Sequence, residues 1–197
     1  VGPYAISGFA ITFPFMNLAA AFGSLIGVWA STLSSVLLGQ KDYDNAKRVL
    51  GNVVVLNFII GGLFTILSLA FLDPILYLFG ASDNTITYAK EYMVIILAGN
   101  IVTHMYLGLN ALLRSSGHPK QAMAATMLTV VLNCILDPIF IFVFDMGIVG
   151  AAWATVLSQM VALIWLLRIF SNKEELIHFQ RGIFRLQKKI VMDSLAI

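Results

Sequence analysis

The sequence predicts an all-α, polytopic membrane helix bundle, and three observations carry this prediction. Of the 197 residues, 59% are hydrophobic and only 11% are charged, whereas charged residues make up about a quarter of an ordinary soluble domain. The apolar residues collect in five charge-poor windows, each long enough for the roughly 20 residues that a spanning helix needs. The charges between the windows sort by sign. We therefore expect five transmembrane helices followed by an amphipathic interfacial helix.

The windows are defined by the near absence of ionisable side chains, because a charge at the bilayer centre costs roughly 2.5 to 3.5 kcal/mol on insertion scales. The first window exceeds one span, so it contains an approach segment or a long tilted helix, which Pro14 can kink or start. Ionisable residues occur only in the third window, as His104, and in the fourth, as Asp137. The windows run from Val1 to Gln40, Val49 to Leu72, Tyr92 to Leu113, Gln121 to Phe144 and Met146 to Leu167.

The loop charges predict the orientation of the chain. All 12 basic residues except Lys90 follow the first, third or fifth window, whereas the alternate loops are acidic. Basic loops favour the cytoplasmic side of a membrane. We therefore expect a multi-pass protein of the plasma (inner) membrane, with loops 41–48 and 114–120 and the C-terminal segment in the cytoplasm and Val1 outside.

The pattern changes after the fifth window, which divides the chain into a transmembrane bundle over residues 1–170 and a cytoplasmic segment over 171–197. In the second part, apolar residues recur at alternating spacings of three and four, opposite basic residues, as in a helix that lies in the membrane interface. A basic helix that binds a partner protein is the alternative. The apolar positions are Leu176, Phe179, Ile183, Leu186 and Ile190.

Small residues recur every four positions in two of the windows, which lets helix backbones approach closely. We interpret these rows as packing seams. Thr155 stays open for a ligand role as well, because its hydroxyl can both pack and coordinate. The rows are Gly23, Gly27, Ser31 and Ser35 in the first window, and Gly147, Ala151, Thr155 beside Gly150, Ala154, Ser158 in the fifth.

Asp137 is the strongest candidate for function, because a carboxylate inside an apolar window marks a functional site by default. Asn133 precedes it by four residues, so both side chains share one helix face. Pro138 has no N–H to donate to the Cys134 carbonyl and tends to open the helix there. The Asp137 carboxylate, the Asn133 amide oxygen and the freed Cys134 carbonyl together suit a hard monovalent cation or a proton. The alternative is that Asp137 caps a helix in the membrane interface.

Other residue types exclude several classes of function. We find no phosphate-binding loop, metal-ligand cluster or nucleophile elbow, so we expect neither an enzyme nor a cofactor. The basic residues are too few and too scattered for a nucleic-acid interface, and the single cysteine, Cys134, leaves no disulfide within the chain. For His104 a hydrogen-bonded structural role is favoured over a proton relay. Tyr92 is most simply an aromatic-belt residue by its position.

Four stretches of the sequence together resemble the multidrug and toxic compound extrusion (MATE) transporters, which belong to a wider group that includes lipid-linked oligosaccharide and polysaccharide flippases. Members have twelve helices in two six-helix lobes. The resemblance implies that this chain supplies the second to sixth helices of the amino-terminal lobe and part of the linker, and that the first helix and second lobe are missing. The stretches are Leu38 to Asp42 with Ala46, Ala111 to Gly117, Leu132-Asn133 to Asp137-Pro138, and Gly147 to Thr155.

The resemblance also implies a site. In the similar subgroup, an acid on the first helix joins the Asn and Asp of an N-x-x-x-D pattern, here Asn133 and Asp137, in a cation or proton site. A tyrosine and a threonine line that site, and the spacing matches Tyr92 and Thr155. We expect no metal beyond a monovalent cation at Asp137.

The function that follows is secondary active efflux: a longer chain exports small amphipathic or cationic substrates and couples their export to inward H⁺ or Na⁺. A flippase of the wider group is the first alternative, but it would be expected to have a more basic central cavity. A membrane scaffold without transport is the second alternative. It predicts that Asp137 can be neutralised without loss of function.

Overall fold

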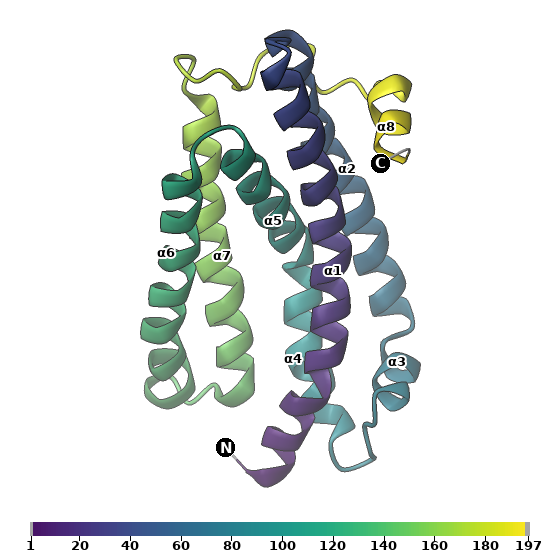
Figure 1. Cartoon of the computed structure of the whole chain (residues 1–197). Coiled ribbons are helices and arrows are strands. Elements are labelled where there is room, and N and C mark those ends of the chain that lie inside the picture. The colour runs from purple at the N-terminus through teal and green to yellow at the C-terminus, as the bar shows by residue number, and fades with distance from the viewer. Residues whose placement is uncertain (1, 196–197) are drawn as a thin grey trace.

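The computed structural model describes residues 2–195 and the side chains of residues 2–192, and all regular elements in this part are helices (Figure 1). The expected all-α bundle is thus confirmed. The elements are α1 (Pro3–Gly39), α2 (Tyr43–Ala70), α3 (Leu72–Leu78), α4 (Ile86–Ala98), α5 (Asn100–Ser115), α6 (Pro119–Pro138), the π-helical turn η1 (Ile139–Val143), α7 (Gly147–Ser171) and α8 (Lys188–Leu195).

Five segments are long and apolar enough to cross a membrane when the bent pair α4 and α5 is counted as one span. The first window forms a single helix of 37 residues that continues through Pro14. The third window differs from its prediction. It begins earlier, at Ile86, and it breaks at Gly99, where α4 and α5 meet at an angle of 52°.

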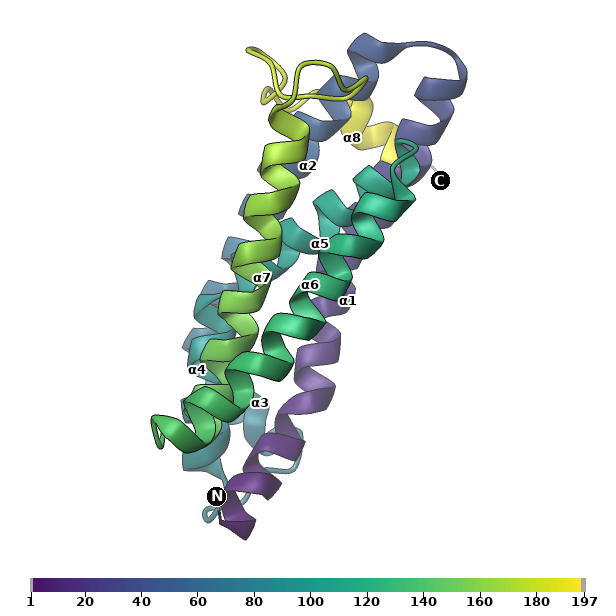
Figure 2. The same ribbon diagram turned by 90° about the vertical axis from the view of Figure 1, so that its left-hand side faces the viewer.

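The spans are arranged around the α4–α5 pair. α1 crosses α5 and packs beside α2 (Figures 1 and 2). α7 contacts α4 and α5, and it also packs along α6. Two clusters of buried apolar residues result. One lies toward the end of the bundle that carries the linker and includes Leu50, Leu109 and Phe170, and the other surrounds α4 and includes Phe15 and Met93.

The seam between α1 and α5 depends on residues without side chains. A Cβ atom added at Gly23 would lie 2.9 Å from Cδ2 of His104, and one added at Gly27 would lie 3.0 Å from Cβ of Ala111. Ser31 continues the row and donates a hydrogen bond from its hydroxyl to the Ala111 carbonyl at 3.0 Å. The predicted packing seam of the first span is therefore confirmed for Gly23, Gly27 and Ser31, with α5 as its partner, whereas Ser35 is exposed and bonds to the Ser31 carbonyl of its own helix.

The rows of the fifth span are confirmed in part. Ala154 and Ser158 are buried, and Gly150 packs against the backbone of Phe140 in η1. Gly147, however, has open space around it and a φ of +57°. It serves the turn into α7, because L-residues with side chains rarely adopt this conformation.

The linker after α7 does not form the amphipathic helix that the spacing predicted. Residues 172–187 form turns and extended backbone, and only Lys188–Leu195 is helical. Ile177, Ile183 and Ile190 are buried in the cluster at the end of the bundle, so they insert as separate anchors instead of sharing one helix face. The Gln187 N–H also donates to Oδ1 of Asn52 in α2 at 3.2 Å. Contacts with the helix ends have overridden the local pattern.

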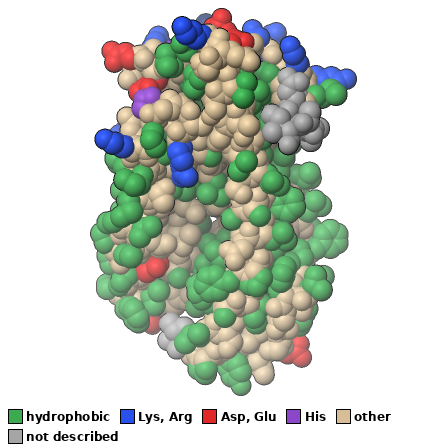
Figure 3. All heavy atoms as spheres, in the orientation of Figure 1, with side chains coloured by type: hydrophobic (Ala, Val, Ile, Leu, Met, Phe, Trp, Pro, Cys, Tyr) green, Lys and Arg blue, Asp and Glu red, His purple; other side chains and the backbone are tan. Residues whose placement is uncertain are grey.

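Lys and Arg side chains gather at the end of the bundle that the linker crosses, whereas the middle of the surface is largely apolar (Figure 3). A contact between side chains holds the linker at this end, because Nε2 of His118 in the α5–α6 turn lies 3.0 Å from the Glu175 carboxylate. The opposite end carries a more exposed ion pair between Lys90 and Asp73, at 2.9 Å.

We predict that replacing Gly23 or Gly27 with Leu lowers the free energy of unfolding by about 1 to 3 kcal/mol for each, because α1 and α5 leave no room for a larger side chain. The melting temperature of the protein in detergent should fall accordingly. Gly39→Leu is the matched control, since no atom lies within 4 Å of its added Cβ. Equal melting temperatures for all three variants would show that the seam is not closely packed.

Candidate functional site

Asp137 lies in the last turn of α6, at the point where the helix changes character. Pro138 ends the α-helix, and the next five residues form the π-helical turn η1. This is the opening that the missing proline N–H predicts. Asp137 is half-buried, and it lies in the only one of the five spans that has a carboxylate within its apolar window.

The Asn133 amide holds the carboxylate. Its terminal atom lies 2.9 Å and 3.1 Å from the two carboxylate oxygens of Asp137, so with its nitrogen on that side it donates to both. The amide orientation that satisfies both groups is assigned from this network. The expected pairing across one turn of the helix is therefore present, and Asp137 acts as the partner of a side chain instead of as a helix cap.

The other end of the Asn133 amide faces α7, where it lies 3.4 Å from Oγ1 of Thr155. The Thr155 hydroxyl also lies 3.1 Å from the carbonyl of Ala151. Its single proton can go to the Asn133 oxygen or to this carbonyl, so the hydroxyl can act as a donor or an acceptor toward the amide. Thr155 both packs between α6 and α7 and lines the site. The sequence analysis left both roles open for this member of the small-residue row.

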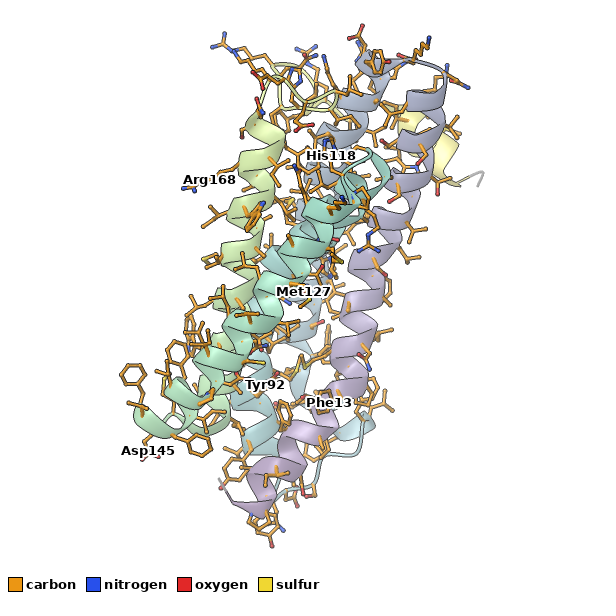
Figure 4. The ribbon with its side chains drawn as sticks, turned by 60° about the vertical axis from the view of Figure 1, so that its left-hand side comes forward. Phe13, Tyr92, His118, Met127, Asp145 and Arg168 are labelled. Atoms are coloured by element: carbon orange, nitrogen blue, oxygen red, sulfur yellow. The ribbon has the colours of Figure 1, made fainter. Side chains whose placement is uncertain are left out.

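Tyr92 completes the cluster from α4. Its hydroxyl is close enough to Thr155 and Asp137 to interact with both electrostatically. Only 2% of the residue is exposed, and its ring meets Phe9 of α1 edge to face at 4.9 Å. The aromatic-belt interpretation is therefore wrong, and Tyr92 lies inside the bundle, as Figure 4 shows.

The break at Gly99, which the sequence analysis missed, sets where Tyr92 lies relative to α7. A Cβ at Gly99 would lie 2.6 Å and 2.8 Å from the two methyl carbons of Val156, the neighbour of Thr155. The bend thus brings the backbone of α4–α5 directly against α7. A glycine followed by an asparagine inside an apolar window was the available signal, because this pair favours a break in a helix.

His104 lies in a separate place. It is fully buried, its Nε2 lies 3.0 Å from the Ala19 carbonyl of α1, and its ring packs beside Gly23 and Gly61. These contacts support the structural role that we favoured. Gln159 of α7 was not singled out from the sequence, yet it accepts a hydrogen bond from Thr103 of α5, one turn from Thr155.

The chemistry of the site follows from its donors. Asp137, Asn133, Thr155 and Tyr92 present a carboxylate, an amide oxygen and two hydroxyls, which are hard oxygen ligands. Among the described residues, no group of three or more His, Cys, Asp or Glu side chains could hold a metal ion. A single carboxylate with neutral oxygens matches the charge of a proton or a monovalent cation, not that of a divalent metal.

A bundle of membrane spans with a polar site between three of them is typical of a multi-pass membrane protein of the transporter class. The MatE family model matches residues 1–139. The chain therefore belongs to the MATE family, as the motifs suggested.

The curated relatives are multidrug exporters. "Multidrug export protein MepA" of Staphylococcus haemolyticus is 32% identical over 176 residues, which cover 89% of this chain and 39% of the relative. MepA of Staphylococcus aureus strain NCTC 8325 is 28% identical over 194 residues, covering 98% of this chain and 43% of the relative. The chain thus spans about two-fifths of the length of these relatives.

Solved structures share the fold closely. A MATE family transporter of the MOP superfamily matches in its inward-facing conformation with a TM-score of 0.94 and 29% identity, over 99% of this chain and 44% of the other. The outward-facing conformation of a MATE family transporter matches with a TM-score of 0.92 and 29% identity, over 100% and 44%. A MATE in the bent conformation matches with 0.93 and 30%, over 98% and 44%.

We predict that Gly99→Ala destabilises the protein by about 1 to 3 kcal/mol, because the new methyl group meets Val156. Adding Val156→Ala to that variant makes room for the methyl group, so the double variant should melt at a higher temperature than Gly99→Ala alone. Gly62→Ala is the control, since its nearest neighbour would be 4.0 Å away. If the two substitutions are simply additive, the contact at the bend does not position α4 against α7.

Proposed function

We propose that this chain contributes the amino-terminal lobe region of a secondary active exporter, which moves small amphipathic or cationic compounds out of the cell and couples their export to inward H⁺ or Na⁺ at Asp137. The observation that carries the proposal is the cluster of Asp137, Asn133, Thr155 and Tyr92, drawn from three spans. The MepA relatives are multidrug export proteins, and this supports the class of substrate.

The Asn133 amide offers a way for the site to respond to the ion. An ionised Asp137 is best paired with the amide nitrogen, which donates to both of its oxygens. A protonated or cation-bound Asp137 is best paired with the amide oxygen, which then accepts a hydrogen bond from the carboxyl O–H or joins the ligands of the cation. Rotation of the amide by half a turn exchanges the two arrangements and moves the nitrogen toward Thr155. Loading of Asp137 thereby changes how α6 and α7 bond to each other.

Coupling also requires that the loaded and empty states prefer different conformations of the transporter. The similarity of this chain to both an inward-facing and an outward-facing structure, with TM-scores of 0.94 and 0.92, supports a lobe that moves largely as a rigid body. In this proposal, the ion adjusts packing within the lobe and so biases its contacts with the remainder of the protein.

The flippase alternative is less well supported. Within the five apolar windows, the only Asp, Glu, Lys, Arg or His side chains are Asp137 and His104, and this gives no basic lining for an acidic lipid-linked sugar. Fold alone does not decide the matter, because a similar structure, a MOP superfamily transporter from Pyrococcus furiosus with a TM-score of 0.90, has a binding pocket of reversed polarity that suggests a different function. The scaffold alternative leaves the Asn133–Asp137 pair without a purpose.

Membrane topology is the first test. A cysteine at Asp83 should react with an impermeant thiol reagent from outside, and one at Lys47 only after permeabilisation, because the basic loops favour the cytoplasm. Cys134, which is exposed, has to be replaced first. Reaction of both cysteines from the same side would contradict the proposed sidedness.

Ion coupling is tested by Asp137→Asn in the full-length protein. We expect gradient-driven efflux in vesicles to fall to the level of passive leak while folding and surface expression persist, because the amide keeps the size of the carboxylate but neither releases a proton nor neutralises a cation. Asn133→Ala should weaken coupling less, since Asn133 contributes only neutral atoms.

Asp145→Asn is the matched control for charge removal. Asp145 lies in the turn between η1 and α7, outside the site (Figure 4). Asparagine tolerates the φ of +53° found at this position. Efflux should be unchanged in this variant. Wild-type gradient dependence in Asp137→Asn would return Asp137 to a structural role and remove the basis for the proposed coupling.

A further inference from the structure

A groove on the bundle surface lies between α6 and α7, near the end that carries the linker. It encloses about 530 Å³, a size typical of small-molecule sites. Its deeper part is lined by apolar side chains, among them Leu128 of α6 and Val161 and Ile164 of α7. The residues of the ion site use other faces of the same helices, since Thr155 meets Asn133 within the seam. The groove is therefore distinct from the ion site.

Polar groups collect at only one end of this groove. Arg168 lies in the last turn of α7, and Asn172 and Glu175 follow in the linker. Figure 4 shows that Arg168 extends away from the bundle, and within the described residues it forms no ion pair. Trp165, which is 40% exposed, lines the groove one turn below Arg168. A cation above an exposed tryptophan is the arrangement found where a membrane meets water.

Gln121 adds an unsatisfied acceptor. Its Oε1 atom is shielded from solvent and has no hydrogen-bond partner within the described part of the chain, although the side chain lines the groove. A shielded amide oxygen without a donor costs free energy, so it indicates a missing partner. Glu175 is a second acceptor, because His118 contacts only Oε2 of its carboxylate at 3.0 Å.

The mouth of the groove therefore offers two kinds of binding group. Arg168 can bind a phosphate, and Asn172 can help through its Nδ2 donor, because its Oδ1 already accepts the Glu174 N–H at 3.1 Å. Glu175 can accept from an N–H donor, and Gln121 can do so once its amide turns to bring Oε1 into the groove that the side chain lines. One cation and one carboxylate complement a headgroup with one negative and one positive charge.

We propose that this groove is a binding site for phosphatidylethanolamine, with the phosphate on Arg168, the ammonium on Gln121 and Glu175, and an acyl chain along the apolar part toward Leu128. Phosphatidylcholine has the same charges but no N–H for Gln121. Phosphatidylglycerol brings a net negative charge next to Glu175. The site thus distinguishes the three lipids by donor and by charge.

Native mass spectrometry of the full-length protein in detergent tests the proposal without any measurement of transport. The delipidated protein is titrated with the three lipids, all carrying the same acyl chains. We expect phosphatidylethanolamine to bind most strongly. Arg168→Gln should weaken its binding about ten-fold, because a charged hydrogen bond to phosphate is lost, and Gln121→Leu should remove the preference over phosphatidylcholine.

Lys173→Gln is the matched control, since it removes an exposed cation from the same segment but does not line the groove. It should leave lipid binding unchanged. Stronger binding of phosphatidylglycerol than of phosphatidylethanolamine would overturn the proposed ligand. Equal effects of Arg168→Gln and Lys173→Gln, in variants that melt like the parent, would overturn the site itself.

Discussion

The interior of a bilayer offers no water, so every polar group within a span needs a partner inside the protein. This constraint explains most of the polar contacts between the helices. Asn100 donates to the Gly61 carbonyl and to Thr65 of α2, and Asn110 donates to the Ala122 carbonyl of α6 at 2.9 Å. Polar side chains of α5 thereby tie it to its neighbours, and Asp137 stands apart as the carboxylate whose neutral partner leaves its charge uncompensated.

Close helix packing is what makes such partnerships possible. His104 reaches the Ala19 carbonyl of α1 because Gly23 and Gly61 leave space on both sides of its ring. A larger side chain at Gly23 would push α1 away from α5 and leave Nε2 of the imidazole without its acceptor, and one at Gly61 would press on the same ring from α2. Packing of small residues and satisfaction of polar groups are therefore one requirement in this bundle, and the same relation recurs where Gly99 brings α4 and α5 against α7.

Local spacing determined how far the sequence could predict this structure. The spans follow from composition, and the Asn133–Asp137 pair follows from one turn of a single helix, so both are visible in the chain. Tyr92 differs, because its burial depends on a bend at Gly99 and on Phe9 of another helix. The linker differs for a related reason: its spacing is helical, but Ile177 and Ile183 each find a separate place between helix ends. Such contacts between distant segments have no local signature.

The position of Asp137 within the lobe bears on how an ion could act there. α6 has only two buried residues, Ala122 and Ala125, both toward the end opposite to Asp137. Within the described chain its main contacts are with α7, α5 and η1, so the half that carries Asp137 is the least enclosed part of the spans. A carboxylate in a tightly enclosed helix would exchange an ion slowly. A carboxylate on a free surface would exchange its ion readily, but the exchange would alter the packing of the helices little. The end of α6 that carries Asp137, held to α7 through Asn133 and Thr155, lies between these limits. In the proposed mechanism, a change in bonding there would alter how α6 packs on α7.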